Sequence, residues 1–331
     1  MSKILIIGSN SFSGSSFIKY LLLNNKYDQD QIFGMSRSEN IIKPLHPALW
    51  PNKNFNFFKF HLVDDLKEII KTIDKIKPSV IVNFAAQSMV AQSWDYPEHW
   101  FQTNCVSTIQ IHNFLRNCDF LDKYIHISTP EVYGNCSGKV NEDYQFDPTT
   151  PYAVSRAATD MSLKTFFKAY KFPVITTRAA NVYGPGQSLY RIIPKTIFSI
   201  LKNEKLMLHG GGVSRRCFIH IDDVSNATFE LIKKGNIGET YHISTDELIT
   251  IRSLVEKICD EMNVDFKNYV EIGEERLGKD MIYHLDSQKL KNQTNWSANI
   301  CLDDGIHETV DWLKSNFNIL KNQSSEYKHL R

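Results

Sequence analysis

A tyrosine and an arginine stand four residues apart in the segment YAVSR, as Tyr152 and Arg156. Thr150 can cap a helix here and Pro151 suits its first turn, so both side chains lie on one helical face. A cation beside a phenol favours the phenolate and lowers its pKa. A phenolate near neutral pH can take a proton from a hydroxyl group while a hydride leaves the attached carbon. The pair therefore predicts the oxidation of an alcohol.

A second pair of reactive residues lies upstream, in the segment HISTPEVYG at 126–134. The run KYIHIS at 123–128 is typical of a strand, so Thr129 and Glu131 come directly after its carboxyl end. In a parallel sheet, residues at this edge point into the crevice where ligands bind. Glu131 is the only acid in STPEVYG, which makes it the candidate for a second proton transfer.

A glycine loop follows the first apolar run, KILIIG at 3–8, in the sequence GSNSFSG. Gly8 permits a tight turn, and Gly14 lets the next helix pack close to the strand. The helix N-terminus then offers N–H groups and a positive dipole to a pyrophosphate. Ser11 holds the middle position, where its Cβ crowds the phosphate and its hydroxyl can donate a hydrogen bond. The pattern indicates a dinucleotide, and a strand–turn–helix without a ligand is the alternative.

The end of the second strand indicates which dinucleotide is bound. In GMSRSEN, Ser36 and Arg37 stand where an acidic residue usually holds the adenosine ribose. A small residue next to a cation can accept a 2′-phosphate, so the segment favours NADP over NAD. Both cofactors stay open, because Glu39 can reach the ribose and Arg37 can be a solvated charge.

Short apolar runs alternate with helical patterns through the first 180 residues. We predict strands at 3–8, 31–35, 55–62, 78–86, 123–128 and 173–179. We predict helices at 64–77, 94–118 and 151–170. This alternation predicts an α/β fold of the Rossmann type, with a doubly wound parallel sheet that binds ligands beyond the carboxyl ends of its strands.

The alternation stops after about Asn181, where GPGQ and HGGGVSRR indicate loops. We expect a dinucleotide-binding domain at 1–180, to which the chain returns at about 215–245. A smaller C-terminal α/β substrate domain would comprise 181–214 and 246–331, with helices in SLVEKICDEM and DDGIHETVDWLKSN. The tail after about Asn322 is polar, and we expect it to fray.

Composition excludes several classes of function. The chain has 331 residues, a formal net charge of +1 and 42% hydrophobic residues, which is typical of one large or two packed soluble domains. The balanced charge gives no reason to expect nucleic acid or an acidic membrane as a partner. Apolar runs are far shorter than the roughly 20 residues that span a bilayer. Six cysteines without a CxxC pair, and the lack of His/Cys clusters, predict free thiols, a cytoplasmic location and no metal.

Eight segments, in a specific order and spacing, carry a resemblance to a known family. They are the glycine loop, NFAAQS (83–88), FQTN (101–104), STPEVYG (128–134), YAVSR (152–156), RAANVYGPGQ (178–187), RRCFIHIDDV (215–224) and RLGKD (276–280). Over nearly its whole length the chain resembles the extended short-chain dehydrogenase/reductase family. More narrowly, it resembles the nucleotide-sugar 4,6-dehydratases that act on dTDP-glucose or GDP-mannose.

The resemblance implies a role for each reactive residue. The Ser/Thr, Tyr and Lys triad of the family matches Thr129, Tyr152 and Arg156, and the catalytic Glu of the dehydratases matches Glu131. Arg156 keeps the charge of the lysine, but its planar head is wider and it does not relay protons. Pro130 replaces the Asp that protonates the leaving group in dTDP-glucose dehydratases, so Glu131 would serve as both base and acid.

The resemblance also implies which residues contact the two ligands. Those for the cofactor are Gly8, Asn10, Ser11, Phe12, Gly14, Ser36, Arg37, Asp64, Ala85, Ala86, Gln87, Asn104, Tyr152, Arg156 and Ala179. Those for a nucleoside-diphosphate hexose are Ser88, Thr129, Asn181, Arg191, Arg216 and Arg276. Asn181 and Arg216 match positions at the pyrophosphate and Arg276 one near the nucleotide, although arginines can also be plain surface charges. His61 stands where the family often has an Asp near the adenine.

The implied reaction converts an NDP-hexose into an NDP-4-keto-6-deoxy sugar. Tyr152 takes the proton of the 4-hydroxyl while C4 gives its hydride to the cofactor. Glu131 then removes the acidified C5 proton, water leaves from C6, the hydride returns to C6 and a proton returns to C5. The cofactor, NADP or NAD, must stay bound because the cycle has no net redox change.

Two other functions stay open. A nucleotide-sugar 4-epimerase needs the same triad but no acid at Glu131. A non-catalytic dinucleotide-binding protein would explain the departures at Ser11, Pro130 and Arg156 together. The sequence names neither the nucleotide base nor the hexose.

The expected assembly is a homodimer. In the family, the helices that match 94–118 and 151–170 pair between subunits in a four-helix bundle. Their apolar residues in this chain include Phe114, Leu115, Phe166 and Phe167. The alternative is that these four residues serve only the core of the monomer.

Overall fold

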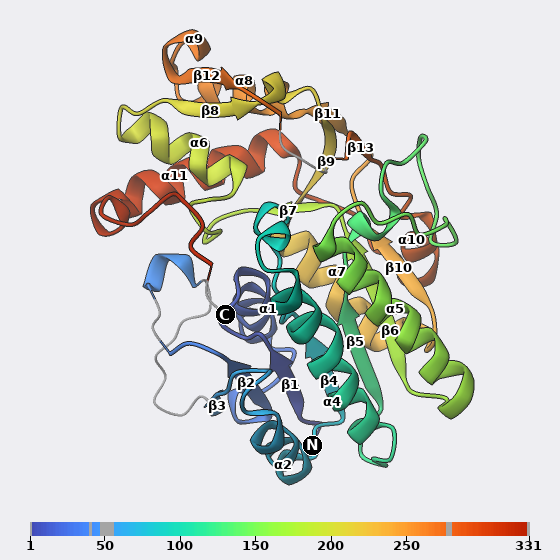
Figure 1. The fold of residues 1–331 in the computed structure, drawn as a ribbon. Helices are drawn as coiled ribbons and strands as arrows, with labels where there is room; N and C mark the ends of the chain where they lie inside the picture. The colour runs from blue at the N-terminus through green and yellow to red at the C-terminus, as the bar shows by residue number, and fades with distance from the viewer. Residues whose placement is uncertain (1, 40–41, 47–55, 276–279, 330–331) are drawn as a thin grey trace.

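The computed structural model of the chain describes residues 2–39, 42–46, 56–275 and 280–329. Its main element is a seven-stranded sheet in which every neighbouring pair is parallel (Figure 1). The strand order is β10-β6-β5-β4-β1-β2-β3. The strands are β1 (Ile4–Ile7), β2 (Ile32–Ser36), β3 (Asn56–Lys59), β4 (Val80–Asn83), β5 (Lys123–Ile127), β6 (Val174–Ala179) and β10 (Thr240–Ile243). The predicted α/β, doubly wound parallel sheet is confirmed.

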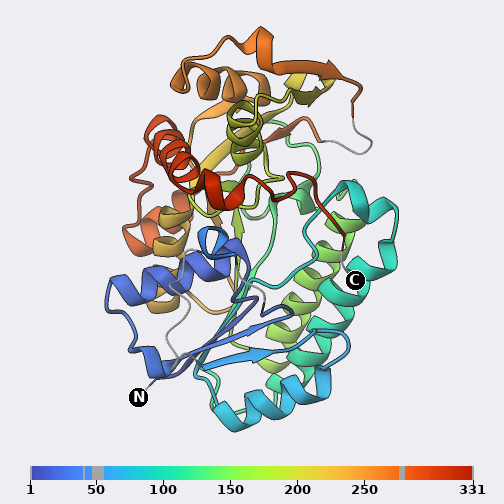
Figure 2. The same ribbon diagram turned by 90° about the vertical axis from the view of Figure 1, so that its left-hand side faces the viewer.

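Helices cover both faces of this sheet (Figure 2). Alternate residues of β1 point to opposite faces, so Ile4 and Ile6 belong to one apolar cluster and Leu5 and Ile7 to another. The first cluster includes α1 (Phe12–Leu23) and α7 (Ile221–Lys234), and the second includes α2 (Leu66–Ile76) and α4 (Thr108–Leu115). Burial on both faces explains why the central strands read as continuous apolar runs.

The remaining strands lie in a second lobe, at the top of Figure 1. One small sheet contains β7 (Asn181–Tyr183), β9 (Arg215–His220), β11 (Leu248–Thr250) and β13 (Ile282–Tyr283), and a second pairs β8 (Leu206–His209) with β12 (Val270–Gly273). Their helices are α6 (Ile192–Leu201), α8 (Ile251–Glu261), α9 (Phe266–Tyr269) and α11 (Leu302–Leu320), while α10 (Gln288–Thr294) packs beside β10 and α7. The predicted domain boundaries stay a prediction: β10 joins the large sheet, whereas β9 pairs within the small one.

The segment predicted as one helix at 94–118 is broken into several pieces. A short turn at Ala91–Trp94 is followed by α3 (Pro97–Trp100), a π-helical stretch at Phe101–Ser107 and α4. Pro97 lacks an N–H group and so begins a new helix instead of continuing one. The π-helical stretch carries Asn104 into the interior, where its side chain is hydrogen-bonded to the backbone of Gln87 in the loop after β4.

The four apolar residues expected at a subunit interface pack against the monomer core, and the interface stays a prediction. Leu115 is buried, and Phe114, Phe166 and Phe167 are partly buried against the same cluster. No helix in the described parts of the chain is long and apolar enough to cross a bilayer.

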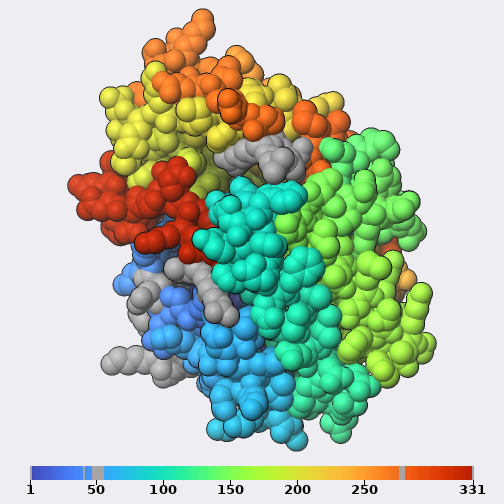
Figure 3. Space-filling model, viewed as in Figure 1, coloured from blue at the N-terminus to red at the C-terminus, as the bar shows by residue number. Residues whose placement is uncertain are grey.

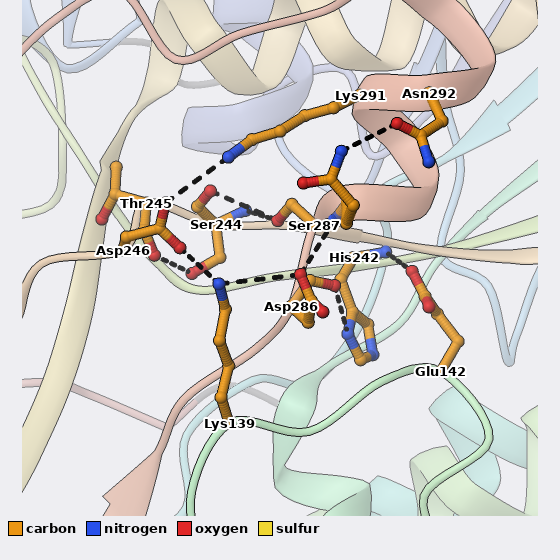
Figure 4. Close-up of polar contacts among 11 residues, drawn as sticks. Lys139, Glu142, His242, Ser244, Thr245, Asp246, Asp286, Ser287, Lys291 and Asn292 are labelled. Carbon is orange, nitrogen blue, oxygen red and sulfur yellow. Dashed lines mark hydrogen bonds and ion pairs between the residues drawn. The ribbon is translucent and has the colours of Figure 1, made fainter.

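The loop between β5 and α5 (Pro151–Tyr170) is tied to the β10–α10 region by polar contacts (Figure 4). Lys139 Nζ lies 2.6 Å from Asp246 Oδ1, and Glu142 Oε1 accepts a hydrogen bond of 2.9 Å from the His242 N–H. The Ser244 N–H donates to Ser287 Oγ at 2.8 Å. The exposed Lys139–Asp246 ion pair and the half-buried Glu142–His242 hydrogen bond hold the loop that follows Glu131 in place, while the Ser244–Ser287 bond joins the two segments that the loop contacts.

A buried carboxylate fastens α5 to the sheet. Asp160 Oδ2 lies 2.7 Å from Arg178 Nη2 of β6 and accepts a 2.7 Å hydrogen bond from Ser128 Oγ after β5. His126 Nε2 of β5 lies 3.3 Å from Asp160 Oδ1. Burial alone would raise the pKa of Asp160, but the Arg178 charge and His126 outweigh it and hold that pKa well below its usual range.

We expect Asp160→Asn to destabilise the protein by about 3–5 kcal/mol, because it leaves the buried Arg178 without its counter-charge. Urea unfolding followed by circular dichroism measures the change. Asp246→Asn is the matched control, since its ion pairs with Lys139 and Lys291 are exposed and contribute about 1 kcal/mol or less. Equal losses in the two variants would contradict the role given to Asp160.

Candidate active site

The turn between β1 and α1 depends on two glycines. Gly8 has a φ of +83°, and a Cβ built there would lie 2.7 Å from the Ala85 nitrogen. A Cβ on Gly14 would collide with the Gly8 carbonyl oxygen. The helix therefore begins close to the strand end, and its N-terminal N–H groups face the crevice at the edge of the sheet. This geometry is the one predicted for a pyrophosphate site.

Ser11 has a local role that the sequence analysis did not assign. It is the N-cap of α1, and its Oγ accepts a 3.0 Å hydrogen bond from the Gly14 N–H. The serine therefore stabilises the start of the helix at the position where many dinucleotide sites have glycine. Its hydroxyl keeps a proton to donate, so the predicted contact with phosphate stays a prediction.

A cavity of about 250 Å³ lies beyond β1, β2 and β4. Eight residues predicted for the cofactor line it: Gly8, Asn10, Ser11, Ser36, Arg37, Ala85, Ala86 and Gln87. His61 also lines this cleft, which we call the cofactor cleft. Its described lining contains no carboxylate.

Seven residues predicted for the cofactor lie outside that lining: Phe12, Gly14, Asp64, Asn104, Tyr152, Arg156 and Ala179. Phe12 packs against the apolar core of the sheet. Asp64 is exposed and pairs with His61, whose Nδ1 lies 3.1 Å from Asp64 Oδ2. Ala179 ends β6 on the far side of the sheet from β2.

Asn104 supports the cleft from behind instead of lining it. Its Oδ1 accepts a 2.8 Å hydrogen bond from the Gln87 N–H, and its Nδ2 donates to the Gln87 carbonyl oxygen at 3.0 Å. The same Nδ2 lies 3.0 Å from Ser155 Oγ in α5. The buried amide thus fixes the loop after β4 relative to the helix that carries Tyr152.

The end of β2 is bonded to the glycine loop. Ser36 Oγ accepts a 2.9 Å hydrogen bond from the Asn10 N–H, and Asn10 Nδ2 donates to the Ser38 carbonyl oxygen. Glu39, the alternative partner for the ribose, is exposed, and its Oε2 lies 4.0 Å from Lys59 Nζ. Arg37 is therefore the charged residue of this strand end that lines the cleft.

Glu131 lies in a single helical turn, Pro130–Tyr133, directly after β5. Thr129 caps this turn, and its Oγ1 accepts a 3.3 Å hydrogen bond from the Glu131 N–H. Burial raises the pKa of Glu131 to about 7, against the opposing charge of Arg216, while Asp280 adds to the rise. A carboxyl with this pKa can both take and give a proton near neutral pH.

Tyr152 lies in the first turn of α5, which Thr150 caps by accepting a 3.2 Å hydrogen bond from the Ala153 N–H. The expectation of a lowered pKa is not met, because burial raises the pKa of Tyr152 and the Glu131 charge raises it further. Arg156 acts in the expected direction and lowers that pKa, as does a hydrogen bond from Thr129. The pKa of Tyr152 thus depends on Arg156 and Thr129, the two residues that the sequence analysis grouped with it.

Arg156 is buried beneath Tyr152 and faces the end of β5. Its Nη2 donates to the Ile127 carbonyl oxygen and lies 3.5 Å from His126 Nε2. His126 in turn contacts Asp160, so the guanidinium lies at one end of the buried network that fastens α5. Its relative exposure is 2%. The wider head group that replaces a lysine is accommodated by a backbone carbonyl and an imidazole.

A second cavity, of about 270 Å³, contains Glu131 and is lined by residues of the upper lobe. We call it the substrate cavity. Asn181 and Arg216 line it, as predicted for substrate contacts, together with Asp280 and Tyr283. Ser88 and Arg191 are bonded to each other, with 3.2 Å between Ser88 Oγ and Arg191 Nη2. Arg276 lies outside the described residues.

Arg216 is held by backbone groups. Its Nη2 donates to the Asp280 carbonyl oxygen at 2.6 Å and its Nη1 to the Met281 carbonyl oxygen at 3.1 Å. The guanidinium lies 4.2 Å from the centre of the Tyr283 ring. This bracing leaves the cation beside the cavity in a fixed position, and its charge lowers the pKa of Glu131.

Asp280 and Tyr283 were given no role by the sequence analysis. Tyr283 donates its hydroxyl hydrogen to Asp280 Oδ2, and Thr149 donates to Asp280 Oδ1 at 2.9 Å. Asp280 ends the RLGKD segment, so its position in that motif was the available signal. Among the described residues, no group of three or more His, Cys, Asp or Glu residues could hold a metal.

The chain is similar to known proteins in sequence and in overall fold. The chain is 30% identical to a dTDP-D-glucose 4,6-dehydratase of Mus musculus, over 97% of this chain and 91% of the mouse protein. A solved dTDP-glucose 4,6-dehydratase of Streptomyces venezuelae, with NAD and TYD bound, is 27% identical and superposes with a TM-score of 0.87 over 96% of this chain and 98% of that one. A UDP-glucuronic acid 4-epimerase of Bacillus cereus is 26% identical, with a TM-score of 0.84 over 95% and 99%.

The family model that matches this chain covers residues 5–309, which include both cavities, the glycine loop, Glu131 and Tyr152. The chain therefore belongs to the GDP-mannose 4,6-dehydratase family, a group of nucleotide-sugar 4,6-dehydratases within the extended short-chain dehydrogenases/reductases.

Proposed function

We propose that the protein is an NAD(P)-dependent NDP-hexose 4,6-dehydratase that forms an NDP-4-keto-6-deoxy sugar. The observation that carries the proposal is Glu131, a carboxyl with a pKa of about 7 that lines the substrate cavity and acts on the pKa of Tyr152. A 4-epimerase has no step that requires such an acid. The names of the curated relatives, which include dTDP-glucose 4,6-dehydratases at about 30% identity, support the same reaction.

The residues divide the proton transfers between them. When bound, the nicotinamide ring accepts a hydride from C4 of the sugar and later returns it to C6. Tyr152 takes the proton of the 4-hydroxyl, assisted by the Arg156 charge. The resulting ketone acidifies C5, and Glu131 removes the C5 proton. Because Pro130 has no acidic group, the protonated Glu131 also supplies the proton for the leaving C6 hydroxyl. A proton returns to C5 when the hydride adds to C6, which balances the proton that Tyr152 took from the 4-hydroxyl.

The raised pKa of Glu131 suits this double role. A carboxyl with an ordinary pKa would be ionised at pH 7 and would hold a transferred proton poorly. Near pH 7, Glu131 is comparably stable in both forms, so it can remove one proton and give one back in the same turnover. Arg216 and Arg191 keep its pKa from rising further.

For the cofactor we propose NADP over NAD. The support is that Arg37 lines the cofactor cleft at the end of β2, while the nearest acid, Glu39, is exposed and pairs with Lys59. A cation in this place suits a 2′-phosphate. Tighter binding of NADH than of NADPH in a direct titration would contradict this preference.

The substrate is proposed to bind with its diphosphate near Arg216 and Asn181 and its sugar between Glu131 and Tyr152. Ser88, Thr129, Arg191 and Arg276 are proposed as further contacts. The location is proposed to be the cytoplasm, because all six cysteines are free. Incubation with a panel of NDP-hexoses, followed by mass spectrometry, tests the reaction through the loss of one water. An epimer without mass change would favour the alternative function.

The assembly is proposed to be a homodimer that pairs the exposed faces of α5 and the π-helical segment. Val106 is 42% exposed, Val154 38% and Met161 59%, although all three are apolar. Together they offer an unpaired apolar face on the two helices that the family resemblance assigned to the interface.

Glu131→Gln should reduce the rate of water loss by about 10²-fold or more, because the amide can neither take nor give the proton. Oxidation at C4 should persist, since Tyr152 and Arg156 are unchanged. The absorbance of the reduced nicotinamide follows oxidation, and mass spectrometry follows dehydration. Glu239→Gln, which alters an exposed acid paired with Lys289, is the control and should behave like the parent.

The same step predicts a pH dependence. Only the ionised Glu131 removes the C5 proton, so the dehydration rate should rise with pH through about 7 and level off above it. The rise should follow a Glu131 pKa that burial has raised above the ordinary value near 4.3. A rate already constant from about pH 5 upward would remove Glu131 from this role.

Arg156→Lys should keep much of the activity, because the charge and the helical position survive. It should bind cofactor more weakly, because one ammonium replaces a fork of donors. Arg156→Met should lose most activity and shift the Tyr152-dependent limb of the pH–rate profile to higher pH, since the Arg156 charge lowers the Tyr152 pKa. An unchanged rate and profile in Arg156→Met would show that the charge does not assist Tyr152.

Met161→Arg should convert the dimer to a monomer, because it places a charge in the centre of the proposed apolar face. Light scattering measures the mass of both proteins at the same concentration. Ile319→Arg is the matched control, since Ile319 is 61% exposed on α11, away from that face. A parent protein that is already monomeric at micromolar concentration would contradict the proposal.

A further inference from the structure

The C-terminal tail does not fray but runs back across the molecule. After α11 ends at Leu320, residues 321–329 pass from the upper lobe toward α3 (Figure 2). In the space-filling view the red C-terminal segment borders the teal segment that carries α3 (Figure 3). The expectation of a frayed tail is wrong for residues 321–329, because Glu326, Tyr327 and His329 contact specific partners.

One end of this tail is held by the upper lobe. Glu326 Oε1 lies 2.6 Å from Lys195 Nζ of α6. The ring of Tyr327 contacts that of Tyr190 in an edge-on arrangement, with 5.2 Å between ring centres. Both partners belong to the segment that leads from β7 into α6, and that segment also carries Arg191.

The other end is held by the lobe of the large sheet. His329 stacks on Trp100, with 4.9 Å between ring centres, and on Tyr96 and His99 at 5.4 and 5.2 Å. A 2.9 Å hydrogen bond joins His99 Nδ1 to His329 Nε2. The aromatic pocket at Tyr96, His99 and Trp100 thus receives the last described residue of the chain.

Tyr327, whose ring packs on Tyr190, also meets the cofactor cleft. The Tyr327 hydroxyl lies 3.5 Å from Oε1 of Gln87, a residue of the cleft lining. Burial raises the pKa of Tyr327 and lowers that of His329, and the charge of Arg37, another residue of the cleft lining, acts on both groups in the lowering direction. The tail is therefore within electrostatic reach of both walls of the cleft.

We propose that residues 321–329 form a strap that completes the dinucleotide site and slows release of the cofactor, with Tyr327 as a positioning residue for the Gln87 loop. The strap contacts both the upper lobe and the lobe of the large sheet, and it meets the cleft lining at Gln87. In this proposal a bound dinucleotide leaves faster once the Tyr327 and His329 contacts are lost. The inference rests on the proposed function, in which one cofactor molecule must accept and return the hydride within the same turnover.

The test measures how fast the full-length protein releases NADH and NADPH. Each reduced cofactor is bound, then displaced by excess oxidised cofactor in a stopped-flow fluorimeter. The double variant Tyr327→Ala/His329→Ala should release the cofactor about tenfold faster than the parent, while its association rate changes little. Lys328→Ala is the matched control, since its side chain is exposed on the same tail, and should release cofactor at the parent rate.

The single variant Tyr327→Phe separates the loss of the Gln87 contact from a general folding defect. It keeps the ring contact with Tyr190 but lacks the hydroxyl beside Gln87, so it should fold like the parent and still release cofactor faster. Parent-like release rates in this variant and in a folded double variant would overturn the strap. A parent protein that binds neither NADH nor NADPH would instead overturn the proposed function, and the strap with it.

Discussion

The carboxylate of Asp160 is the constraint on which the geometry of the site depends. It accepts from Arg178 on β6 and from Ser128 after β5, and it contacts His126 on β5, so three elements meet at one buried charge. Arg178 reaches further, because it also donates to the Tyr133 hydroxyl at the end of the Glu131 turn. The helix with Tyr152 and the turn with Glu131 are therefore positioned by the same ion pair, which explains why a charge is kept in the core.

The two substitutions in the reactive centre have different consequences. The Arg156 guanidinium lies between the Ile127 carbonyl and His126, which accommodate its larger size. The cation therefore stays near Tyr152. Pro130 is different, because nothing replaces the missing carboxyl in the turn itself. In the proposed mechanism both proton transfers then fall to Glu131, and its raised pKa is the physical condition under which one carboxyl can serve twice.

Short sequence patterns predicted the features that depend on residues close together in the chain. The Thr150 cap, the glycine loop and the buried strands were visible in the sequence because capping, tight turns and burial on two faces leave short patterns. The orientation of Arg216 toward backbone carbonyls, the pairing of Asp280 with Tyr283 and the return of the tail to Trp100 were not visible. Each depends on contacts between residues far apart in the chain, which no short pattern records.

The bond from the Asn10 N–H to Ser36 Oγ has a consequence for how this protein can change over evolutionary time. In many dinucleotide folds, an acid at the end of the second strand selects the cofactor. Here Ser36 stands at that position, and its hydroxyl oxygen also holds the turn that is proposed to receive the diphosphate. A replacement of Ser36 that alters coenzyme choice must also supply a new acceptor for the Asn10 N–H. A substitution at Ser36 that changes coenzyme selectivity would therefore also change the support of the glycine loop, and a second substitution would have to restore that support.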